Sequence, residues 1–408
     1  MSHKPLIVHI ITRLEPGGSS RNTVDSCAAQ AADHDVVLLA GPHKDSGGLL
    51  KLLPPEVNYI EVPDLAREIG AVKDLRTLFE LRRELSRLKP DIVHTHTSKA
   101  GALGRLAAAM ANLGAKKPAI IIHTPHGHLL YGYYGPIRTS VFRLAERFLA
   151  RFTDYFIALT PGELRESVQA GMGRSSQWTV VHSGVDLKPP KVPAHKRDLD
   201  IAADDIVIGT VARLEPVKGV GYFIRAAAAL RNSMPAARLR FLIVGGGALK
   251  TELRDLADQL DLAGRVIFTG FREDAHALMG AMDIYVQPSL NEAMGRAPLE
   301  AQAMGLPAVV SSVCGLPDII REGETGFAVK PADPAALAAA LKKLIASPAL
   351  RSSMGTAAKN WALSADASGF PRFGPESMNA QLKTFYAYAL NKAKRTEQRS
   401  PAAKIPRP

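Results

Sequence analysis

Short runs of β-branched and aliphatic residues alternate with helix-like segments twice along this chain, and this alternation restricts the fold more than any other feature of the sequence. In the first half the runs cover 6–11, 36–40, 91–96, 119–124, 155–160 and 178–183; in the second half they cover 205–212, 239–245, 265–270, 283–289, 307–312 and 326–330. A strand that is apolar along its whole length is buried on both faces, so such runs separated by helices predict parallel sheets covered on both sides. The sequence therefore predicts an α/β protein made of two doubly wound, Rossmann-like domains.

A segment rich in proline and charge, "LKPPKVPAHKRDLDIAADD" at 187–205, separates the two series of strands and has the composition of a linker. We predict five segments: an N-terminal domain over 1–187, a linker over 188–204, a C-terminal domain over 205–366, a helix over 367–392 and a basic, disordered tail over 393–408. Ligands of open α/β sheets bind beyond the carboxyl ends of the strands. Two facing domains therefore predict a site in the cleft between them.

The cellular compartment is indicated by what the sequence lacks. Only two cysteines, Cys27 and Cys314, are present, and they lie far apart, which disfavours a disulfide framework and fits a reducing compartment. The first residues lack the pattern of a signal peptide, and no apolar stretch approaches the roughly 18 residues that cross a bilayer. We expect a soluble cytoplasmic protein, or one that is peripheral on the inner face of the membrane.

The net charge of +12 is concentrated in two segments, +7 between residues 92 and 153 and +5 from residue 391 onward. Such clustering indicates an anionic partner: phosphates, acidic lipid or nucleic acid. The alternative is that the basic residues serve solubility alone. Nucleic acid is disfavoured because the clusters lack interleaved aromatic residues and a recognition motif, apart from a tyrosine-rich loop.

The first basic segment contains an amphipathic pattern over 136–152, preceded by the tyrosines of "YGYYG". One face is apolar, and arginines at i, i+4 spacing form a basic stripe: Ile137, Val141, Leu144, Phe148 and Phe152 on the first, Arg143, Arg147 and Arg151 on the second. Residues 131–152 therefore predict contact with an anionic membrane surface, with the basic tail assisting. A core helix of the N-terminal domain with an exposed basic face is an equal alternative.

Several candidate binding residues follow predicted strands. Arg213 and Lys218 come after the strand at 205–212, and two cations at that place are suited to bind a diphosphate. The alternative is that they are two exposed basic residues of a surface loop with no ligand. Gly245, in "IVGGGALK", begins a turn that allows close approach of the backbone to a ligand. Gly17 and Gly18 form a similar turn before a helix, whose N-terminal N–H groups would face the cleft.

Two glutamates eight positions apart, Glu292 and Glu300, stand in "NEAMGRAPLEAQAMGLPAVV". An ionised carboxylate only accepts hydrogen bonds, so vicinal hydroxyl groups are its natural partners. One glutamate for a sugar and one for a ribose would explain the pair. The alternative is two glutamates that favour the start of a helix through its dipole.

Three histidines follow another strand in "HTPHGH" at 123–128, but their spacing fits no zinc pattern and no carboxylate lies nearby in the sequence. We therefore predict no metal site, one histidine facing the cleft and the other two packed or bonded to backbone. The chain also lacks a P-loop, a His-Glu-x-x-His motif and a Gly-x-Ser-x-Gly motif. This disfavours P-loop nucleotide hydrolases, zincins and α/β-hydrolases.

"RLEPVKG" together with "PSLNEAMGRAPLEAQAMGLPAVVSSVCGLPDIIREGETGFAVKPADP" resembles the C-terminal half of glycosyltransferase family 4, the retaining enzymes of GT-B fold. "DIVHTHTSKAGALGRLAA", "HTPHGH" and "SGVDL" resemble that family's N-terminal half, and the likeness covers about residues 5 to 390. It implies an N-terminal domain that binds the acceptor and a C-terminal domain that binds the nucleotide sugar. It also implies that the helix at 367–392 returns to the N-terminal domain.

The resemblance implies roles for individual residues. The implied catalytic residues are His126, which reaches the reacting sugar, Glu292, which lies against it, and Arg213 and Lys218, which hold the diphosphate. Among the implied donor-binding residues, Gly17 and Gly18 lie near the diphosphate and the acceptor, and Phe271 and Arg272 border the base. Met294, Gly295 and Arg296 contribute backbone N–H groups, and Glu300 binds the ribose. The turn at Gly245 is added to this donor site. The family commonly has Gly and then Phe after the first glutamate, where this chain has Ala293 and Met294, so the donor sugar is harder to infer.

The expected function is retaining transfer of a sugar from a nucleotide-diphosphate sugar to an acceptor hydroxyl, without metal or cofactor, because cations and backbone can stabilise the departing diphosphate. UDP is favoured over GDP. The expected acceptor is a glycan or lipid-linked precursor in the assembly of cell-surface glycans. The alternatives are another GT-B enzyme, such as a nucleotide-sugar 2-epimerase, or a non-catalytic polyanion-binding protein.

Overall fold

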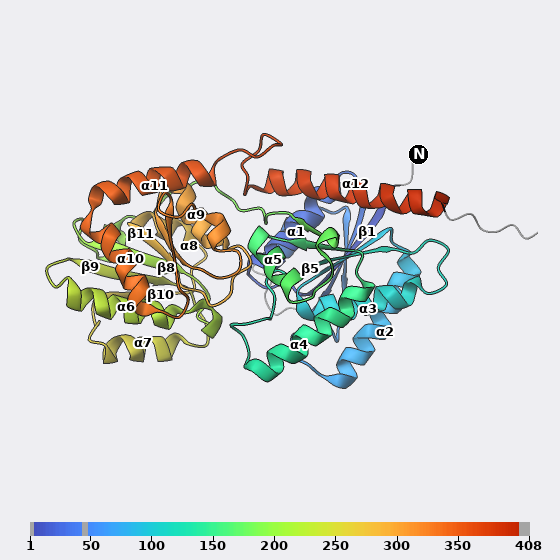
Figure 1. Ribbon diagram of the computed structural model, residues 1–408, viewed down its shortest axis with the longest axis horizontal. Helices are drawn as coiled ribbons and strands as arrows, with labels where there is room; N and C mark the ends of the chain where they lie inside the picture. Colours follow the sequence, from blue (N-terminus) through green and yellow to red (C-terminus); the bar gives the residue numbers. More distant parts are fainter. Residues whose placement is uncertain (1–3, 43–47, 400–408) are drawn as a thin grey trace, which may run out of the picture.

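The computed structural model describes residues 4–42 and 48–399, and it contains two α/β units, each built on a parallel sheet (Figure 1). The first sheet has the order β3-β2-β1-β4-β5-β6-β7. Its strands are β1 (Leu6–Arg13), β2 (Asp35–Gly41), β3 (Val57–Glu61), β4 (Ile92–His96), β5 (Ile120–Thr124), β6 (Tyr155–Ala158) and β7 (Trp178–Val180). The helices of this unit are α1 (Gly18–Gln30), α2 (Ala71–Leu88), α3 (Ser98–Asn112), α4 (Pro136–Leu149) and α5 (Pro161–Gln169).

The second sheet has the order β10-β9-β8-β11-β12-β13. Its strands are β8 (Ile206–Val211), β9 (Leu239–Val244), β10 (Val266–Gly270), β11 (Ile284–Gln287), β12 (Ala308–Ser311) and β13 (Gly326–Val329). The helices that follow the linker are α6 (Val220–Ser233), α7 (Lys250–Gln259), α8 (Ala275–Leu278), α9 (Arg296–Ala303), α10 (Pro334–Ala346), α11 (Pro348–Ala362) and α12 (Pro375–Arg399). The prediction of two doubly wound α/β domains is confirmed.

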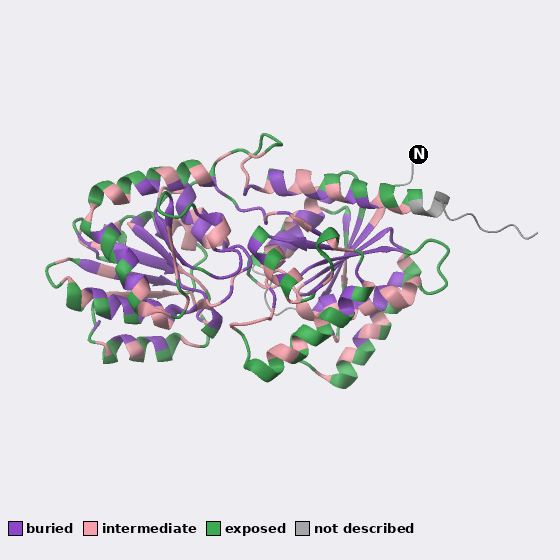
Figure 2. Cartoon of the chain, viewed as in Figure 1, coloured by how far each residue is buried: buried purple, intermediate pink, exposed green. Residues whose placement is uncertain are grey.

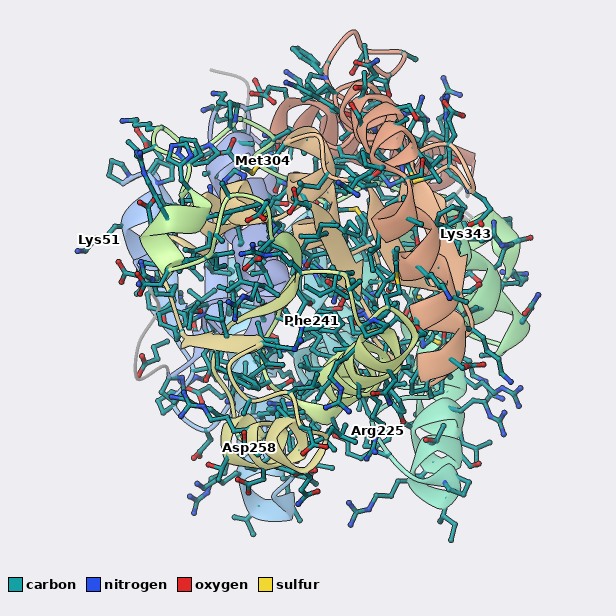
Figure 3. All side chains as sticks on the ribbon, turned by 90° about the vertical axis from the view of Figure 1, so that its left-hand side faces the viewer. Lys51, Arg225, Phe241, Asp258, Met304 and Lys343 are labelled. Atoms are coloured by element: carbon teal, nitrogen blue, oxygen red, sulfur yellow. The ribbon has the colours of Figure 1, made fainter. Side chains whose placement is uncertain are left out.

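Burial follows the apolar pattern of the strands. The strands lie at the centre of each unit and are mostly buried, whereas the helices expose their outer faces (Figure 2). In the second domain, the ring of Phe241 on β9 packs edge-on against Phe223 of α6, with the ring centroids 5.9 Å apart. Figure 3 shows Phe241 in the interior, and Asp258 and Lys343 on the helices around it. Strands with no polar face require helices on both sides of the sheet, as the sequence predicted.

The last helix, α12, leaves the second domain and packs on the first (Figure 1). Its buried residues recur at helical spacing, namely Met378, Leu382, Tyr386 and Ala389, and they contact a cluster that includes Ile7 of β1 and Ile92 of β4. The helix begins at Pro375 and continues to Arg399, so residues 393–399, predicted as part of a disordered tail, are helical. The rest of the predicted tail, 400–408, lies outside the described residues.

Helix α4 contradicts one of the two interpretations of the 136–152 segment. Its apolar residues Ile137, Val141, Leu144 and Phe148 are all exposed, so the reading as a core helix with only a basic outer face is wrong. The helix is instead held through polar contacts: the buried guanidinium of Arg105 on α3 pairs with Glu146 at 2.7 Å. Within the described residues, no helix combines the length and the apolar character needed to cross a membrane.

Replacing Leu382 by alanine tests the docking of α12. The side chain is 4% exposed within the core of the first domain, and Leu382→Ala should reduce the free energy of unfolding by about 2–5 kcal/mol. Thermal denaturation followed by circular dichroism measures this change. Thr384→Ala, at an exposed position of the same helix, is the control. Equal melting temperatures for the two variants would show that α12 does not contribute to the core.

Candidate active site

The order of the second sheet reverses between β8 and β11, and a charged pair lies beyond this point. Lys218 ends the turn after β8, Glu292 lies on the loop after β11, and Lys218 Nζ is 2.5 Å from Glu292 Oε2. The two side chains are 18% and 19% exposed, so both remain accessible to a ligand. In open α/β sheets the crevice outside the carboxyl ends at such a reversal is where ligands bind.

A chain of hydrogen bonds that begins on β11 orients the carboxylate of Glu292. Tyr285 OH donates to Gln287 Oε1 (2.9 Å), Gln287 Nε2 donates to Ser289 Oγ (2.8 Å), and Ser289 Oγ donates to Glu292 Oε2 (3.4 Å). Tyr285, Gln287 and Ser289 are buried, and burial raises the pKa of Tyr285, so its hydroxyl group stays neutral and can donate. A buried network whose members are satisfied holds the carboxylate in one orientation.

Glycines bring the loops around this pair close together. Gly219 has φ of +65°, and a Cβ there would lie 2.0 Å from the carbonyl oxygen of Pro288, so the turn after β8 requires glycine. A Cβ on Gly245 (φ +142°) would lie 1.9 Å from the carbonyl oxygen of Ala212. The close approach at Gly245 is therefore to the protein's own backbone, whereas the sequence pattern had suggested approach to a ligand.

Helix α9 starts at the same edge of the second sheet, after β11. Gly295 (φ +85°) precedes it, and Met294 is buried. Arg296 Nη1 donates to the carbonyl oxygen of Gly184 and lies 3.4 Å from Ser183 Oγ, so its side chain crosses to the first domain. A Cβ on Gly18 would lie 3.2 Å from Arg296 Cδ, which places the α1 glycine turn against the start of α9.

Glu300 lies one turn into α9 and is half-buried. Burial raises the pKa of its carboxyl group, and the charge of Arg296 opposes this shift. Its oxygens accept no hydrogen bond from any residue that the structure describes. A half-buried carboxylate without a protein donor is suited to accept hydrogen bonds from hydroxyl groups of a ligand.

The first domain contributes His126, on the loop after β5. The residue has a positive φ of +56°, which is uncommon without glycine, and its Nε2 lies 2.9 Å from His96 Nδ1. Burial lowers the pKa of His126 to about 3, so the ring is neutral at physiological pH. A Cβ on Gly127 would lie 3.7 Å from Ala293 Cβ, so this segment lies against the residue that follows Glu292.

The remaining predicted residues lie farther out. Gly17 is exposed before α1. Arg213 is exposed and pairs with Glu215 at 3.0 Å, and Arg272 pairs with Asp274 at 2.7 Å. Phe271 is exposed beside the glycine turn, where a Cβ on Gly246 would meet its Cβ at 3.3 Å. The structure brings two pairs of predicted residues together: Lys218 with Glu292, and Gly18 with Arg296. Arg213 and Arg272 instead pair with acidic residues of their own loops.

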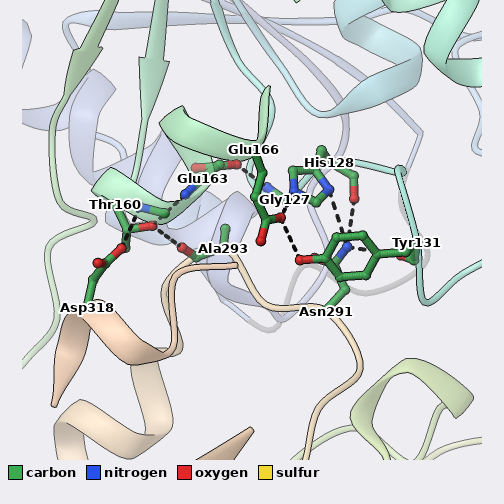
Figure 4. A network of polar contacts seen from close by, with 10 residues as sticks. Gly127, His128, Tyr131, Thr160, Glu163, Glu166, Asn291, Ala293 and Asp318 are labelled. Carbon is green, nitrogen blue, oxygen red and sulfur yellow. Dashed lines mark hydrogen bonds and ion pairs between the residues drawn. The ribbon is translucent and has the colours of Figure 1, made fainter. Parts of the chain in front are cut away.

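Two carboxylates from α5 lie beside the "HTPHGH" segment in space, although none lies near it in the sequence (Figure 4). Glu163 Oε1 accepts from Gly127 N at 2.7 Å, and Glu166 Oε2 lies 2.6 Å from both His128 Nε2 and Tyr131 OH. His128, Glu166 and Cys314 bring potential metal ligands within 4.8 Å of one another. The hydrogen bonds that Glu166 makes with His128 and Tyr131 explain why these groups lie close together, without a metal ion. Both carboxylates are on α5, so the spacing of residues within the motif could not reveal them.

Asn291, which was not predicted, joins the loop of Glu292 to the first domain, and Figure 4 shows it beside His128 and Tyr131. Its buried Nδ2 donates to the carbonyl oxygens of His128 (3.1 Å) and Tyr131 (3.0 Å). On the other side of Glu292, Thr160 Oγ1 donates to the carbonyl oxygen of Ala293 at 2.9 Å. Residues 291–293 are thus held to the first domain, which fixes Glu292 relative to the His126 loop.

Comparisons with known proteins show which family the two domains resemble. Residues 17–184 match the family described as glycosyl transferase 4-like domain, and residues 191–361 match glycosyl transferases group 1. The Escherichia coli UDP-Gal:alpha-D-GlcNAc-diphosphoundecaprenol alpha-1,3-galactosyltransferase is 32% identical over 293 residues, 70% of this chain and 74% of its own.

Two solved structures share the fold. Anabaena HepE in complex with UDP aligns with a TM-score of 0.73 at 22% identity, over 94% of this chain and 100% of its own. Sucrose-phosphate synthase from Thermosynechococcus elongatus aligns with a TM-score of 0.77 at 21% identity, over 95% of this chain and 100% of its own.

Replacing Asn291 by alanine tests the contact between the domains. The change leaves two buried carbonyl groups without their donor, at a cost of about 1–3 kcal/mol. Asn291→Ala should therefore increase amide hydrogen exchange in residues 126–131, while exchange in the β1 strand stays unchanged. Asn232→Ala, at an exposed asparagine on α6, is the matched control. Exchange at 126–131 equal to that of the control would contradict a role of Asn291 in joining the domains.

Proposed function

Because this chain belongs to the GT-B glycosyltransferases, we propose that it is a retaining, metal-independent enzyme of glycosyltransferase family 4 that uses a UDP-sugar. We propose a hexosyl or N-acetylhexosaminyl group as the sugar and a lipid-linked or polysaccharide precursor as the acceptor. The Lys218–Glu292 pair at the reversal of the second sheet carries this proposal. Support comes from a relative named for UDP-Gal and a diphosphoundecaprenol acceptor, and from a neighbour of the same fold in complex with UDP.

In the proposed mechanism Lys218 serves the departing nucleotide. Breaking the bond between the anomeric carbon and the diphosphate develops negative charge on the phosphate oxygens. The Lys218 ammonium neutralises this charge, and Arg213, which is exposed on the same loop, adds a second cation. When the diphosphate binds, the Lys218 ammonium leaves its ion pair with Glu292 and pairs with a phosphate oxygen. The Glu292 carboxylate then accepts a hydrogen bond from a sugar hydroxyl.

The other residues complete the donor site. Glu300 accepts from the ribose hydroxyls, since its oxygens have no donor among the described residues. The backbone N–H groups at 294–296 border sugar and phosphate, and Phe271 borders the uracil ring beside the glycine turn. In this mechanism the acceptor hydroxyl oxygen bonds to the anomeric carbon from the face that the nucleotide leaves, and its proton passes to an oxygen of the departing diphosphate. Attack on that face retains the configuration. Closure of the two domains around His126 and Glu292 excludes water from the reacting carbon.

Binding of UDP and transfer test this proposal. Lys218→Ala removes a charged hydrogen-bond donor to phosphate and should weaken UDP binding about 10- to 100-fold in isothermal titration calorimetry without metal. Glu292→Gln should not weaken UDP binding, because Lys218 gives up this partner when the diphosphate binds. It should lower kcat by about 100-fold or more, because the Glu292 side chain acts on the sugar. Lys342→Ala, an exposed lysine of α10, is the control. UDP affinity of Lys218→Ala equal to that of the control would refute this donor site.

For the acceptor, we propose that α4 rests on an anionic membrane. Its four exposed apolar residues are Ile137, Val141, Leu144 and Phe148, and they are accompanied by the exposed arginines Arg138, Arg143, Arg147 and Arg151. Helix α2 lies at the same lower edge of the first domain and also exposes apolar residues, among them Val72, Leu75 and Phe79 (Figure 1). Apolar insertion combined with arginine charge matches acidic phospholipid.

Matched valine substitutions test this surface. Val141 is 60% exposed on α4, and Val192 is 79% exposed in the linker. Val141→Asp should reduce binding to phosphatidylglycerol vesicles about tenfold in a sedimentation assay, because it removes about 1.5–3 kcal/mol of apolar burial and adds a repelled charge. Val192→Asp should bind like the wild type. Equal binding of both variants, or equal binding of the wild type to neutral phosphatidylcholine vesicles, would contradict the proposed membrane contact.

A further inference from the structure

A line of three histidines, of which His9 and His96 are buried and His126 is partly buried, connects the candidate active site to the interior of the first domain. His126 Nε2 lies 2.9 Å from His96 Nδ1, and His96 Nε2 lies 2.9 Å from His9 Nδ1. His9 Nε2 in turn lies 2.8 Å from Gln30 Oε1, at the end of α1. Both ring nitrogens of His9 and of His96 are thus used within the line, and only His126 Nδ1 has no partner among the described residues.

Each ring in this line is neutral. Burial lowers the pKa of His9 to about 4 and that of His126 to about 3, and it holds the pKa of His96 well below its usual value. A neutral imidazole has one N–H donor and one acceptor nitrogen. Each neutral ring in the line therefore donates to one neighbour and accepts from the other, so all the donors point towards the same end of the line. The group that His9 contacts at the end opposite His126 then determines which nitrogen of His126 carries the proton.

Gln30 is that group. Its Oε1 can only accept, so His9 Nε2 donates to it, His96 Nε2 donates to His9, and His126 Nε2 donates to His96. The Gln30 amide is oriented by α12, because its Nε2 donates to Tyr386 OH at 3.4 Å. Because Tyr386 OH accepts from Gln30, its own hydrogen is available to His94 Nδ1, which lies 2.5 Å away. This direction leaves a lone pair on His126 Nδ1.

A metal ion is the competing explanation, since nitrogens of His9, His94 and His96 lie within 4.8 Å of one another. However, His9 Nδ1 and His96 Nε2 are 2.9 Å apart, which is the length of a direct hydrogen bond. The nitrogens of His94 are taken by Tyr386 OH and by Thr124 Oγ1, the latter at 2.8 Å. The cluster is therefore satisfied by hydrogen bonds alone.

We propose that Gln30, acting through His9 and His96, fixes the tautomer of His126 so that Nδ1 accepts a hydrogen bond from a hydroxyl of the donor sugar. Gln30, His9 and His96 are then positioning residues that touch no substrate. This proposal rests on the proposed function for the identity of the ligand, but the tautomer itself is a property of the free protein.

Nitrogen NMR of the histidine rings tests the tautomer directly, because protonated and unprotonated ring nitrogens have distinct ¹⁵N shifts. In protein labelled with ¹⁵N-histidine, the His126 signals are those lost in His126→Gln. The wild type should show Nε2 protonated and Nδ1 unprotonated. Gln30→Met, which keeps the length of the side chain but removes the acceptor, should give a mixture of tautomers. It should also lower kcat about tenfold or more with UDP affinity unchanged.

Two controls keep the test decisive. Ser26→Ala changes another buried polar residue of α1, whose hydroxyl donates to Asn22 O within the same helix, and it should leave the tautomer and kcat unchanged. If Gln30→Met does not fold, Tyr386→Phe releases the Gln30 amide and should shift the tautomer in the same direction.

A His126 protonated on Nδ1 in the wild type, a tautomer unchanged in the folded variant, or stoichiometric zinc by elemental analysis would overturn the proposal. If the wild type shows the expected tautomer but no glycosyl transfer, the tautomer proposal is supported and only the proposed function is contradicted.

Discussion

The hydrogen bonds that the Asn291 amide donates across the domain boundary set the geometry on which the candidate site depends. Each domain contributes residues to the candidate site at the carboxyl ends of its strands, His126 after β5 and Lys218 and Glu292 after β8 and β11. Asn291 ties the loop of Glu292 to the loop of His126, while Arg296 ties the start of α9 to the first domain. The candidate site therefore depends on how the two domains are placed relative to each other.

Most of the fold could be predicted from the sequence, because buried parallel strands leave a strong local signal. Every run of β-branched residues named as a strand became one, from Leu6–Arg13 to Gly326–Val329. The end of α12 was misplaced because its polar, basic last turns have the composition of a tail. The orientation of α4 could not be predicted either. Periodicity shows that a helix has an apolar face, but not whether another element covers it, and here Arg105 attaches the opposite side.

For the site, the sequence identifies the edge of the sheet at which residues gather when each of them follows a strand. Lys218 and Glu292 meet because both follow strands at the reversal of the second sheet. The sequence does not identify contacts that join segments far apart in the chain. Glu166 reaches His128 from another helix, and Tyr386 reaches Gln30 across 356 positions. Such pairs have no shared periodicity or spacing, so only the folded arrangement of sheets and helices reveals them.

A crystal structure of the protein with UDP, grown without metal, tests the central claim most directly. The diphosphate should lie beyond β8 and β11 with an oxygen within hydrogen-bonding distance of Lys218 Nζ, the ribose hydroxyls should contact Glu300, and the Lys218–Glu292 contact of 2.5 Å should be broken or shared. UDP bound elsewhere, or bound with that ion pair intact and no contact to Glu300, would contradict the assignment of this crevice as the donor site.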